Sequence, residues 1–113
     1  MTQNLTNQNQ VALEKSVDLN GQQVKSMIEA GMLWLRTNHQ IVNALNVFPV
    51  PDGDTGSNML LTMQAGWQEI AKTSEDHVGN MLSLMARGVL MGARGNSGVI
   101  LSQFWRGFSR ATE

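Results

Sequence analysis

Two aspartates stand two positions apart in a segment rich in glycine and small polar residues, at positions 51–58. An extended chain points such side chains the same way, and the segment's glycines also permit a turn with positive φ. Either geometry can bring the carboxylates of Asp52 and Asp54 to one hard cation, such as Mg²⁺ or Ca²⁺. A helix should begin directly after them, and the free N–H groups of a helix start attract an anion. The segment therefore predicts a binding site for metal-bound phosphate. Its candidate phosphate-binding residues are Thr55, Gly56, Ser57 and Asn58.

The same residues have a simpler interpretation as a helix cap and a tight turn, because turns use Asp, Gly, Thr, Ser and Asn. The stiff lead-in at residues 48–51, Phe-Pro-Val-Pro, argues against this interpretation, since a solvated turn has little need of such stiffening. An EF-hand is excluded. With Asp52 in its first position, Gly56 and Met63 fall where that loop needs oxygen ligands.

A second glycine-rich segment, residues 92–98, leads into another predicted helix. A glycine loop at a helix start is a recurring device for binding phosphate. This one is neither a Walker A loop, because no Gly-Lys-Ser/Thr stands at the required spacing, nor a Rossmann loop, because no strand precedes it. An ordinary turn between helices explains it equally well, and sequence alone leaves open whether the two segments face each other. Its candidate phosphate-binding residues are Gly95, Asn96, Ser97 and Gly98.

The composition describes a chain that can fold around a core, since 42% of its 113 residues are hydrophobic and 15% are charged. The formal net charge of -1 gives no general attraction to nucleic acid or to anionic membranes. The absence of cysteine excludes disulfides and thiolate metal sites. No apolar stretch is long enough to span a membrane, and the start, Met1–Gln10, is too polar for a secretory signal. A soluble, cytoplasmic protein is therefore expected.

Apolar residues recur at helical spacing along most of the chain, after a polar lead-in expected over residues 1–17. The predicted helices cover residues 21–38, 57–72, 78–92 and the stretch after Ser97, with a short helical turn over 40–46. We find no strand alternation and no internal repeat, so the predicted fold class is all-α. The last helix is apolar on more than one face, which favours an enclosed position. The chain stops soon after it without a closing cap, which is typical of a domain that has been cut.

Two stretches resemble the signatures of a known family. Residues 45–59, LNVFPVPDGDTGSNM, and residues 88–103, GVLMGARGNSGVILSQ, are similar, in the right order, to the two signatures of DAK2 (DhaL-type) kinase domains. They resemble most the N-terminal, ATP-binding domain of bacterial fatty acid kinase. The resemblance covers residues 18–110 and implies a barrel or bundle of antiparallel helices that holds ATP at one end through two Mg²⁺ ions.

The resemblance also implies roles for particular residues. It assigns Asp52 and Asp54 to the metal, and it places Thr55 and Asn58 at the helix start beside the phosphates. The second phosphate loop would contain Ser97 and Gly98. The related dihydroxyacetone kinase subunit has one more metal-binding aspartate, where this chain has Val47, so the neighbouring Asn46 is only a weak candidate for the third ligand.

Domains of this kind continue with further helices that close the barrel, so residues 18–113 are expected to form only the N-terminal half, unable to phosphorylate a substrate alone. The implied activity of the intact protein is transfer of the ATP γ-phosphate to a fatty acid carboxylate presented by a separate protein. A homodimer is left open, and no catalytic residue is assigned beyond the metal ligands. One alternative is dihydroxyacetone (glycerone) phosphorylation, against which Val47 argues. The other is a non-catalytic helical module that binds nucleotide or a partner without turnover.

Overall fold

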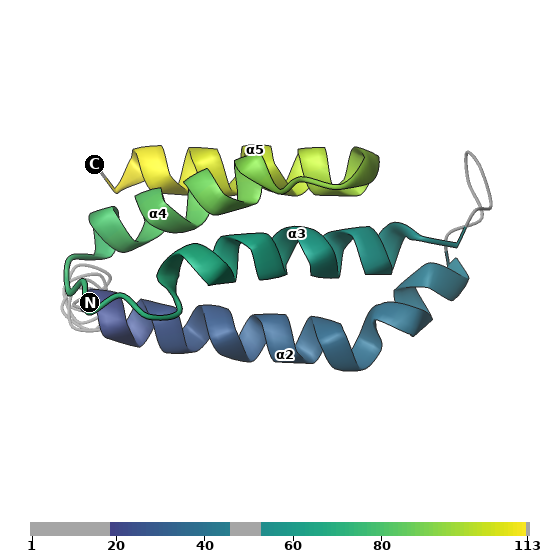
Figure 1. Cartoon of the computed structure of the whole chain (residues 1–113), viewed down its shortest axis with the longest axis horizontal. Coiled ribbons are helices and arrows are strands. Elements are labelled where there is room, and N and C mark those ends of the chain that lie inside the picture. The colour runs from purple at the N-terminus through teal and green to yellow at the C-terminus, as the bar shows by residue number, and fades with distance from the viewer. Residues whose placement is uncertain (1–18, 46–52, 113) are drawn as a thin grey trace, which may run out of the picture.

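Four α-helices make up the part of the chain that the computed structural model describes, residues 19–45 and 53–112. They are α2 (Gly21–Leu45), α3 (Thr55–Ile70), α4 (Val78–Met91) and α5 (Gly95–Ala111). Each runs antiparallel to the helix before it, so α3 and α5 point the same way and begin at the same end of the bundle (Figure 1). The described residues contain no strand, which confirms the predicted all-α fold class. None of the four helices combines the length and the apolar character that crossing a membrane requires.

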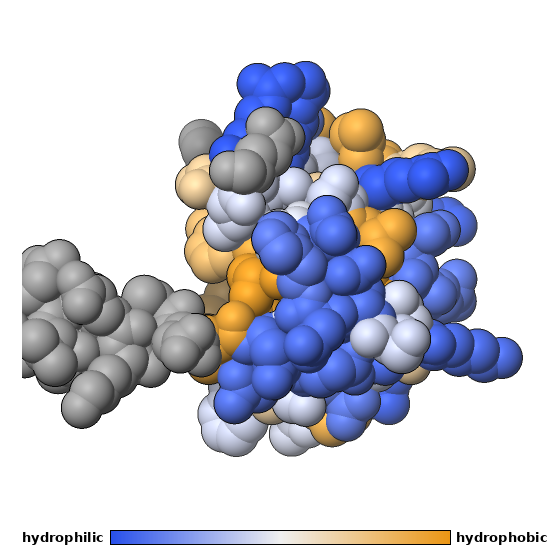
Figure 2. Space-filling view, turned by 90° about the vertical axis from the view of Figure 1, so that its left-hand side faces the viewer, coloured by the Kyte–Doolittle hydropathy of each residue, from blue (hydrophilic) through white to orange (hydrophobic). Residues whose placement is uncertain are grey.

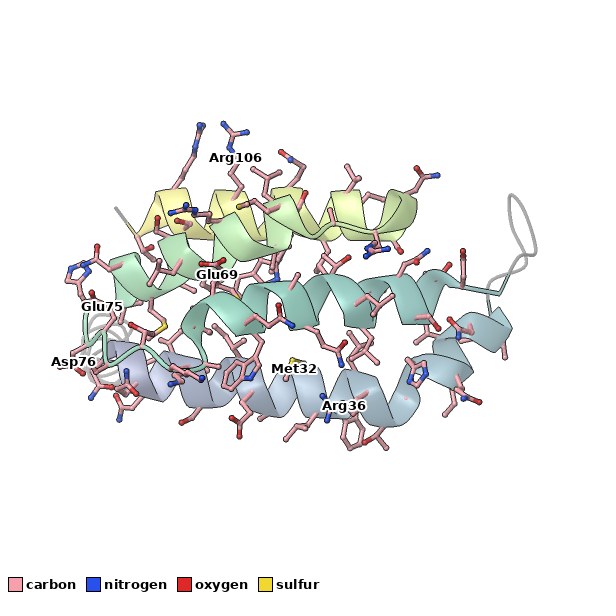
Figure 3. The ribbon with its side chains drawn as sticks, in the orientation of Figure 1. Met32, Arg36, Glu69, Glu75, Asp76 and Arg106 are labelled. Atoms are coloured by element: carbon pink, nitrogen blue, oxygen red, sulfur yellow. The ribbon has the colours of Figure 1, made fainter. Side chains whose placement is uncertain are left out.

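The core lies where α3 and α4 pack against each other and against α2. Helix α4 contributes Met81, Leu82, Met85 and Val89, which are at most 1% exposed and form one stripe along the helix. Met32 points from α2 toward α3 (Figure 3) and is also buried. Burial of each such side chain contributes about 1.5–3 kcal/mol, so this stripe stabilises the frame that carries the helix ends.

Side chains of α2 hold the loop between α3 and α4. The Lys25 Nζ atom donates to the carbonyl oxygens of Ala71, at 2.6 Å, and Thr73, at 3.3 Å. The Gln22 Nε2 atom donates to the carbonyl oxygens of Thr73, at 3.2 Å, and Glu75, at 2.8 Å. The last carbonyls of a helix lack partners within it, so these bonds both end α3 and fix the turn into α4. Glu75 marks this end of the bundle in Figure 3, opposite the starts of α3 and α5.

The segment from Gly21 to Leu45 is one continuous helix, whereas the sequence predicted a break after residue 38. The predicted break falls within the polar run at residues 37–40. Polar side chains of this run bond back along the helix. For example, Asn38 Nδ2 donates to the Trp34 carbonyl at 2.8 Å. The prediction of a separate turn over 40–46 is therefore wrong for the described residues, because α2 continues through the polar run.

Helix α5 lies at the outside of the described bundle. It packs on α3 and α4 through small buried residues, Gly98, Ser102 and Ser109, and through the half-buried Leu101 and Trp105. Within the described residues its backbone does not approach that of α2. Several of its large apolar side chains are exposed, and Ile100 is 71% and Phe104 60% exposed. The predicted enclosed position is therefore wrong for the described part of the chain, because these side chains face away from the described helices while Leu101 and Trp105 pack on the core.

Candidate phosphate- and metal-binding site

The two predicted phosphate-binding segments lie side by side at one end of the bundle (Figure 1). Ser97, in the first turn of α5, donates a hydrogen bond from its hydroxyl to the carbonyl oxygen of Thr55, the first residue of α3, at 3.3 Å. Asn96 stands exposed in the same turn of α5. The structure therefore brings together two helix starts whose mutual placement the sequence left open, through residues 42 positions apart.

Two glycines allow the start of α5 to approach α3 closely. Gly95 has a φ of +66°, and a Cβ atom there would stand 2.5 Å from Nδ2 of Asn58. Gly98 is buried, and a Cβ atom on it would collide with the hydroxyl of Thr62. Glycine adopts the positive φ at position 95 without strain, and its lack of a Cβ atom permits the close approach at both positions. Asn58 and Gly95, predicted from separate motifs, are therefore direct neighbours.

Thr62 joins the two helix starts, and sequence reasoning missed it. Its side chain is fully buried, and its hydroxyl donates to the Asn58 carbonyl at 2.7 Å. The same oxygen accepts a hydrogen bond from the backbone amide of Arg94, the N-cap residue of α5, at 3.0 Å. A threonine that bonds back along its own helix is common, so that bond was foreseeable. The contact with Arg94, 32 positions away, has no local signal in the sequence.

Asp54 directly precedes α3 and keeps its carboxylate exposed. It occupies the N-cap position, where its carbonyl accepts a bond from the Asn58 amide at 2.9 Å, but its side chain makes no capping hydrogen bond. Gly53 before it has a φ of +67°, as the predicted turn requires. The other predicted metal ligands, Asp52 and Asn46, lie outside the described residues. The pairing of the two carboxylates on one cation therefore stays a prediction.

Asn43, near the end of α2, caps the start of α3, and sequence reasoning missed it as well. Its Oδ1 atom accepts from the backbone amide of Ser57 at 3.0 Å, and its Nδ2 atom donates to the Ser57 hydroxyl at 2.9 Å. Gly56 makes this approach possible, because a Cβ atom there would collide with the carbonyl oxygen of His39 on α2. The start of α3 is therefore fixed by a helix that lies earlier in the chain.

The chemical groups at this end of the bundle suit a phosphate accompanied by a hard cation. The Asp54 carboxylate and the side-chain oxygens of Thr55 and Asn58 are ligands of the kind that Mg²⁺ prefers. The first amides of α3 and α5 supply the positive ends of two helix dipoles. No three His, Asp or Glu side chains gather around a metal position within residues 19–45 and 53–112. A cation here fits the usual magnesium arrangement, with one or two carboxylates and the oxygens of a phosphate ligand.

A separate apolar groove of about 440 Å³ opens between α2 and α5, toward the end where α2 begins. Its lining contains no charged residue, so it differs in chemistry from the phosphate-binding end. The Trp105 indole nitrogen donates to the Met63 sulfur at 3.2 Å along this groove. Figure 2 views that end of the bundle and shows hydrophobic atoms between hydrophilic ones. The lining residues are Leu19, Val24, Met27, Ile28, Gly31, Met63, Val78, Leu82, Trp105, Phe108 and Thr112.

Comparison with known proteins identifies the family of the chain. Residues 49–113 match the model of the DAK2 domain. Protein YloV of Bacillus subtilis (strain 168) is 54% identical over 95 residues, which cover 84% of this chain and 17% of that protein. Uncharacterized proteins of Staphylococcus aureus strains USA300 and NCTC 8325 / PS 47 are each 48% identical over 95 residues, with the same coverage of 84% and 17%. The chain thus spans about a sixth of the length of these relatives. Since the match to the family model covers more than half of the chain, the chain belongs to the DAK2 domain family.

Proposed function

We propose that this chain forms part of the ATP- and Mg²⁺-binding portion of a kinase. The family supports the class of activity, because DAK2 domains are the nucleotide-binding part of DhaL-type kinases. The observation that carries the proposal is the contact between the helix starts at Thr55–Asn58 and Gly95–Gly98, beside the exposed carboxylate of Asp54. Two adjacent helix starts favour an anion with several charged oxygens, and the neighbouring carboxylate favours the cation that such an anion brings.

The proposed roles follow from these positions. Asp54 and Asp52 would hold Mg²⁺, with two ions expected and Asn46 as a weaker candidate ligand. Metal bound there supplies positive charge to the β- and γ-phosphates. The helix starts at Thr55–Asn58 and Gly95–Gly98 would orient the phosphoryl group, in a site where fixed donors need little rearrangement during reaction.

The finer proposal is that the phosphoryl group goes to a fatty acid carboxylate presented by a partner protein. A carboxylate is already ionised at pH 7, so this acceptor needs no general base, and none is assigned. The Phe-Pro-Val-Pro lead-in at residues 48–51 and the valine at position 47 support a fatty acid kinase over a dihydroxyacetone kinase. Turnover with dihydroxyacetone, and none with a fatty acid and its carrier, would reverse this assignment.

We also propose that residues 18–113 form one part of a larger helical domain, preceded by a lead-in over residues 1–17. Two features support further helices beside this bundle. Several large apolar side chains of α5 are exposed, and α2 and α5 stand apart with an apolar groove between them. The curated relatives are also much longer, since the matched residues are 17% of each.

Calorimetric titration with Mg-ATP tests the nucleotide site, in this chain and in a version that continues over the relatives' next helices. We expect binding by the extended version, removed by Asp54→Ala and kept by Asp76→Ala. Asp76 is the matched control, because it is also an exposed aspartate but lies at the opposite end of the bundle (Figure 3). Binding by neither version, or binding that survives Asp54→Ala, would contradict the proposed function.

A further inference from the structure

Helix α3 has an aspartate in its N-cap position that does not cap it. An aspartate there normally accepts a hydrogen bond from the amide of the second or third helical residue. The third residue of α3 is Ser57, and its amide lies 3.0 Å from Oδ1 of Asn43. The Asp54 side chain makes no capping bond. The cap of α3 therefore comes from α2, 14 positions earlier in the chain.

Both the oxygen and the nitrogen of the Asn43 side-chain amide have a suitable hydrogen-bond partner at this position. The Oδ1 atom faces a donor, the Ser57 amide, and the Nδ2 atom faces an acceptor, the Ser57 hydroxyl, at 2.9 Å. The opposite orientation would set two donors against each other, so the contacts determine how the amide is turned. Close packing of Gly56 against the His39 carbonyl holds the two helices at the distance that Asn43 spans.

We propose that Asn43 is a positioning residue for the cation site: it satisfies the third amide of α3 and so leaves the Asp54 carboxylate free to bind a cation. A carboxylate that caps its own helix has an oxygen committed to backbone N–H groups, and a metal has to displace them. Asn43 takes over the cap without adding a charge of its own. The inference rests on the proposed function, because the cation in question is the one that accompanies the nucleotide phosphates.

Binding of Mn²⁺ in the presence of ATP, followed by electron paramagnetic resonance, tests this role in whichever version of the chain binds Mg-ATP. Asn43→Ala opens the cap to Asp54, and we expect it to weaken Mn²⁺ binding about fivefold to tenfold, the equivalent of one helix cap. Asn43→Asp keeps an acceptor for the Ser57 amide and adds a negative charge that attracts a cation, so it should bind Mn²⁺ at least as tightly as the wild type. Asn38→Ala is the matched control on the same helix, because among the described residues the Asn38 side chain bonds to the Trp34 carbonyl within α2 and not to α3, and it should leave Mn²⁺ binding unchanged.

The ¹⁵N resonance of the Ser57 amide gives a second measurement that a purely structural role would not move. In the Asn43→Ala protein, Asp54 should have taken over the cap, so adding Asp54→Ala should shift this resonance. In the wild-type protein, Asp54→Ala should leave it in place, because Asn43 still holds the amide.

The measurements distinguish a failure of this inference from a failure of the proposed function. If Asn43→Ala lowers the melting temperature but binds Mn²⁺ like the wild type, Asn43 only joins two helices and the inference is overturned. An Asn43→Asp protein that binds as weakly as Asn43→Ala would also overturn it. If the wild type itself binds no Mn²⁺ with ATP, the proposed function fails instead. The Ser57 resonance still reports in that case whether Asn43 or Asp54 caps α3.

Discussion

The buried hydroxyl of Thr62 serves two helices at once. It accepts from the amide of Arg94 at the start of α5 and donates to the carbonyl of Asn58 in α3. A buried hydroxyl costs free energy unless it is hydrogen-bonded, and the amide at the start of a helix has no partner within the helix. One oxygen atom therefore satisfies both requirements, and the alignment of the two helix starts depends on it.

Replacement of Thr62 by valine isolates this oxygen, because valine has nearly the same shape and is also β-branched. We expect Thr62→Val to lower the free energy of unfolding by about 1–3 kcal/mol, since the Arg94 amide loses its acceptor. Urea denaturation measures the change. Thr37→Val is the matched control, because the Thr37 hydroxyl bonds only to the Leu33 carbonyl on the exposed side of α2. It should change stability by less than about 0.5 kcal/mol. Equal effects of the two substitutions would show that the Thr62 bonds contribute little.

The carboxylate of Glu75 makes the stability of the turn into α4 depend on pH. The backbone amide of His77 donates to its carboxylate at 3.0 Å, and this bond, followed by one from the Asn80 side chain, lowers the pKa of Glu75 from its ordinary value of 4.5. A carboxylate whose pKa is lower in the folded chain stabilises the fold above its ordinary pKa. That stabilisation is lost as the pH falls through the lowered pKa.

Thermal melts at a series of pH values test this contribution. Glu75→Gln should melt below the wild type at pH 7, because the neutral amide is a weaker acceptor for the His77 amide than the carboxylate. The difference in melting temperature should shrink as the pH falls from 4.5 through the lowered pKa, where the carboxylate of the folded wild type also becomes neutral. A difference that stays constant over this range would mean that the charge of Glu75 is not what stabilises the turn.

At the scale of the helices, α5 packs on α3 through the face that carries its smallest side chains. Two glycines of α5 differ sharply in their surroundings. A Cβ atom on Gly98 would collide with the Thr62 hydroxyl, while one on Gly107 would meet nothing within 4 Å. The close packing of α5 on α3 therefore depends on Gly98 and leaves Gly107 free to vary.

The two corresponding alanine substitutions should change the free energy of unfolding in opposite directions. Gly107→Ala should raise the free energy of unfolding by about 0.5–1 kcal/mol, because alanine favours the helix. Gly98→Ala should lower it by about 1–3 kcal/mol, because the extra methyl group forces α5 away from α3. Chemical denaturation of both proteins measures the difference. Stabilisation by Gly98→Ala would contradict the close packing of the two helices.

The helices themselves were largely predictable, because apolar spacing is a local property of the sequence. The predicted start of the third long helix, residue 78, agrees with α4, which begins at Val78. The start of α3 was predicted two residues late, at residue 57, and the start of α5 at least three residues late, after Ser97. Both helices begin with small polar or glycine residues, which carry no apolar spacing and so give no sign that the helix has started.

The arrangement of the site was less predictable than its residues. The acidic turn and the glycine loop are contiguous motifs, so their residues could be named from the sequence. Their contact depends on Thr62 and Ser97, and the cap of α3 depends on Asn43. In the sequence, Thr62 and Asn43 look like any other polar residues on a predicted helix, because their partners lie 32 and 14 positions away. Only the packing of the helices gives them a role.

At the scale of the whole molecule, much apolar surface of α2 and α5 faces outward. Trp34 is 72% exposed on α2, and Ile100 is 71% and Phe104 60% exposed on α5. The rings of Phe104, Trp105 and Phe108 also form a cluster along α5, with neighbouring centroids 6.0–6.1 Å apart. Extended apolar surfaces of this kind mark places where another layer packs. They support the proposal that further helices cover this side in a longer protein.

Ile100→Gln should distinguish a covered face from an open one. In this chain the side chain is 71% exposed, so the substitution should change the free energy of unfolding by less than about 0.5 kcal/mol. In a version extended over the relatives' next helices, where we propose that this face is buried, it should cost about 2–4 kcal/mol. Val89→Ala is the control, because Val89 is buried already and should have a similar cost in both versions. Urea denaturation of the variants gives the comparison. A small effect of Ile100→Gln in both versions would show that this face of α5 stays in water. A large effect in the short chain that depends on protein concentration would show that a second copy of the chain covers it.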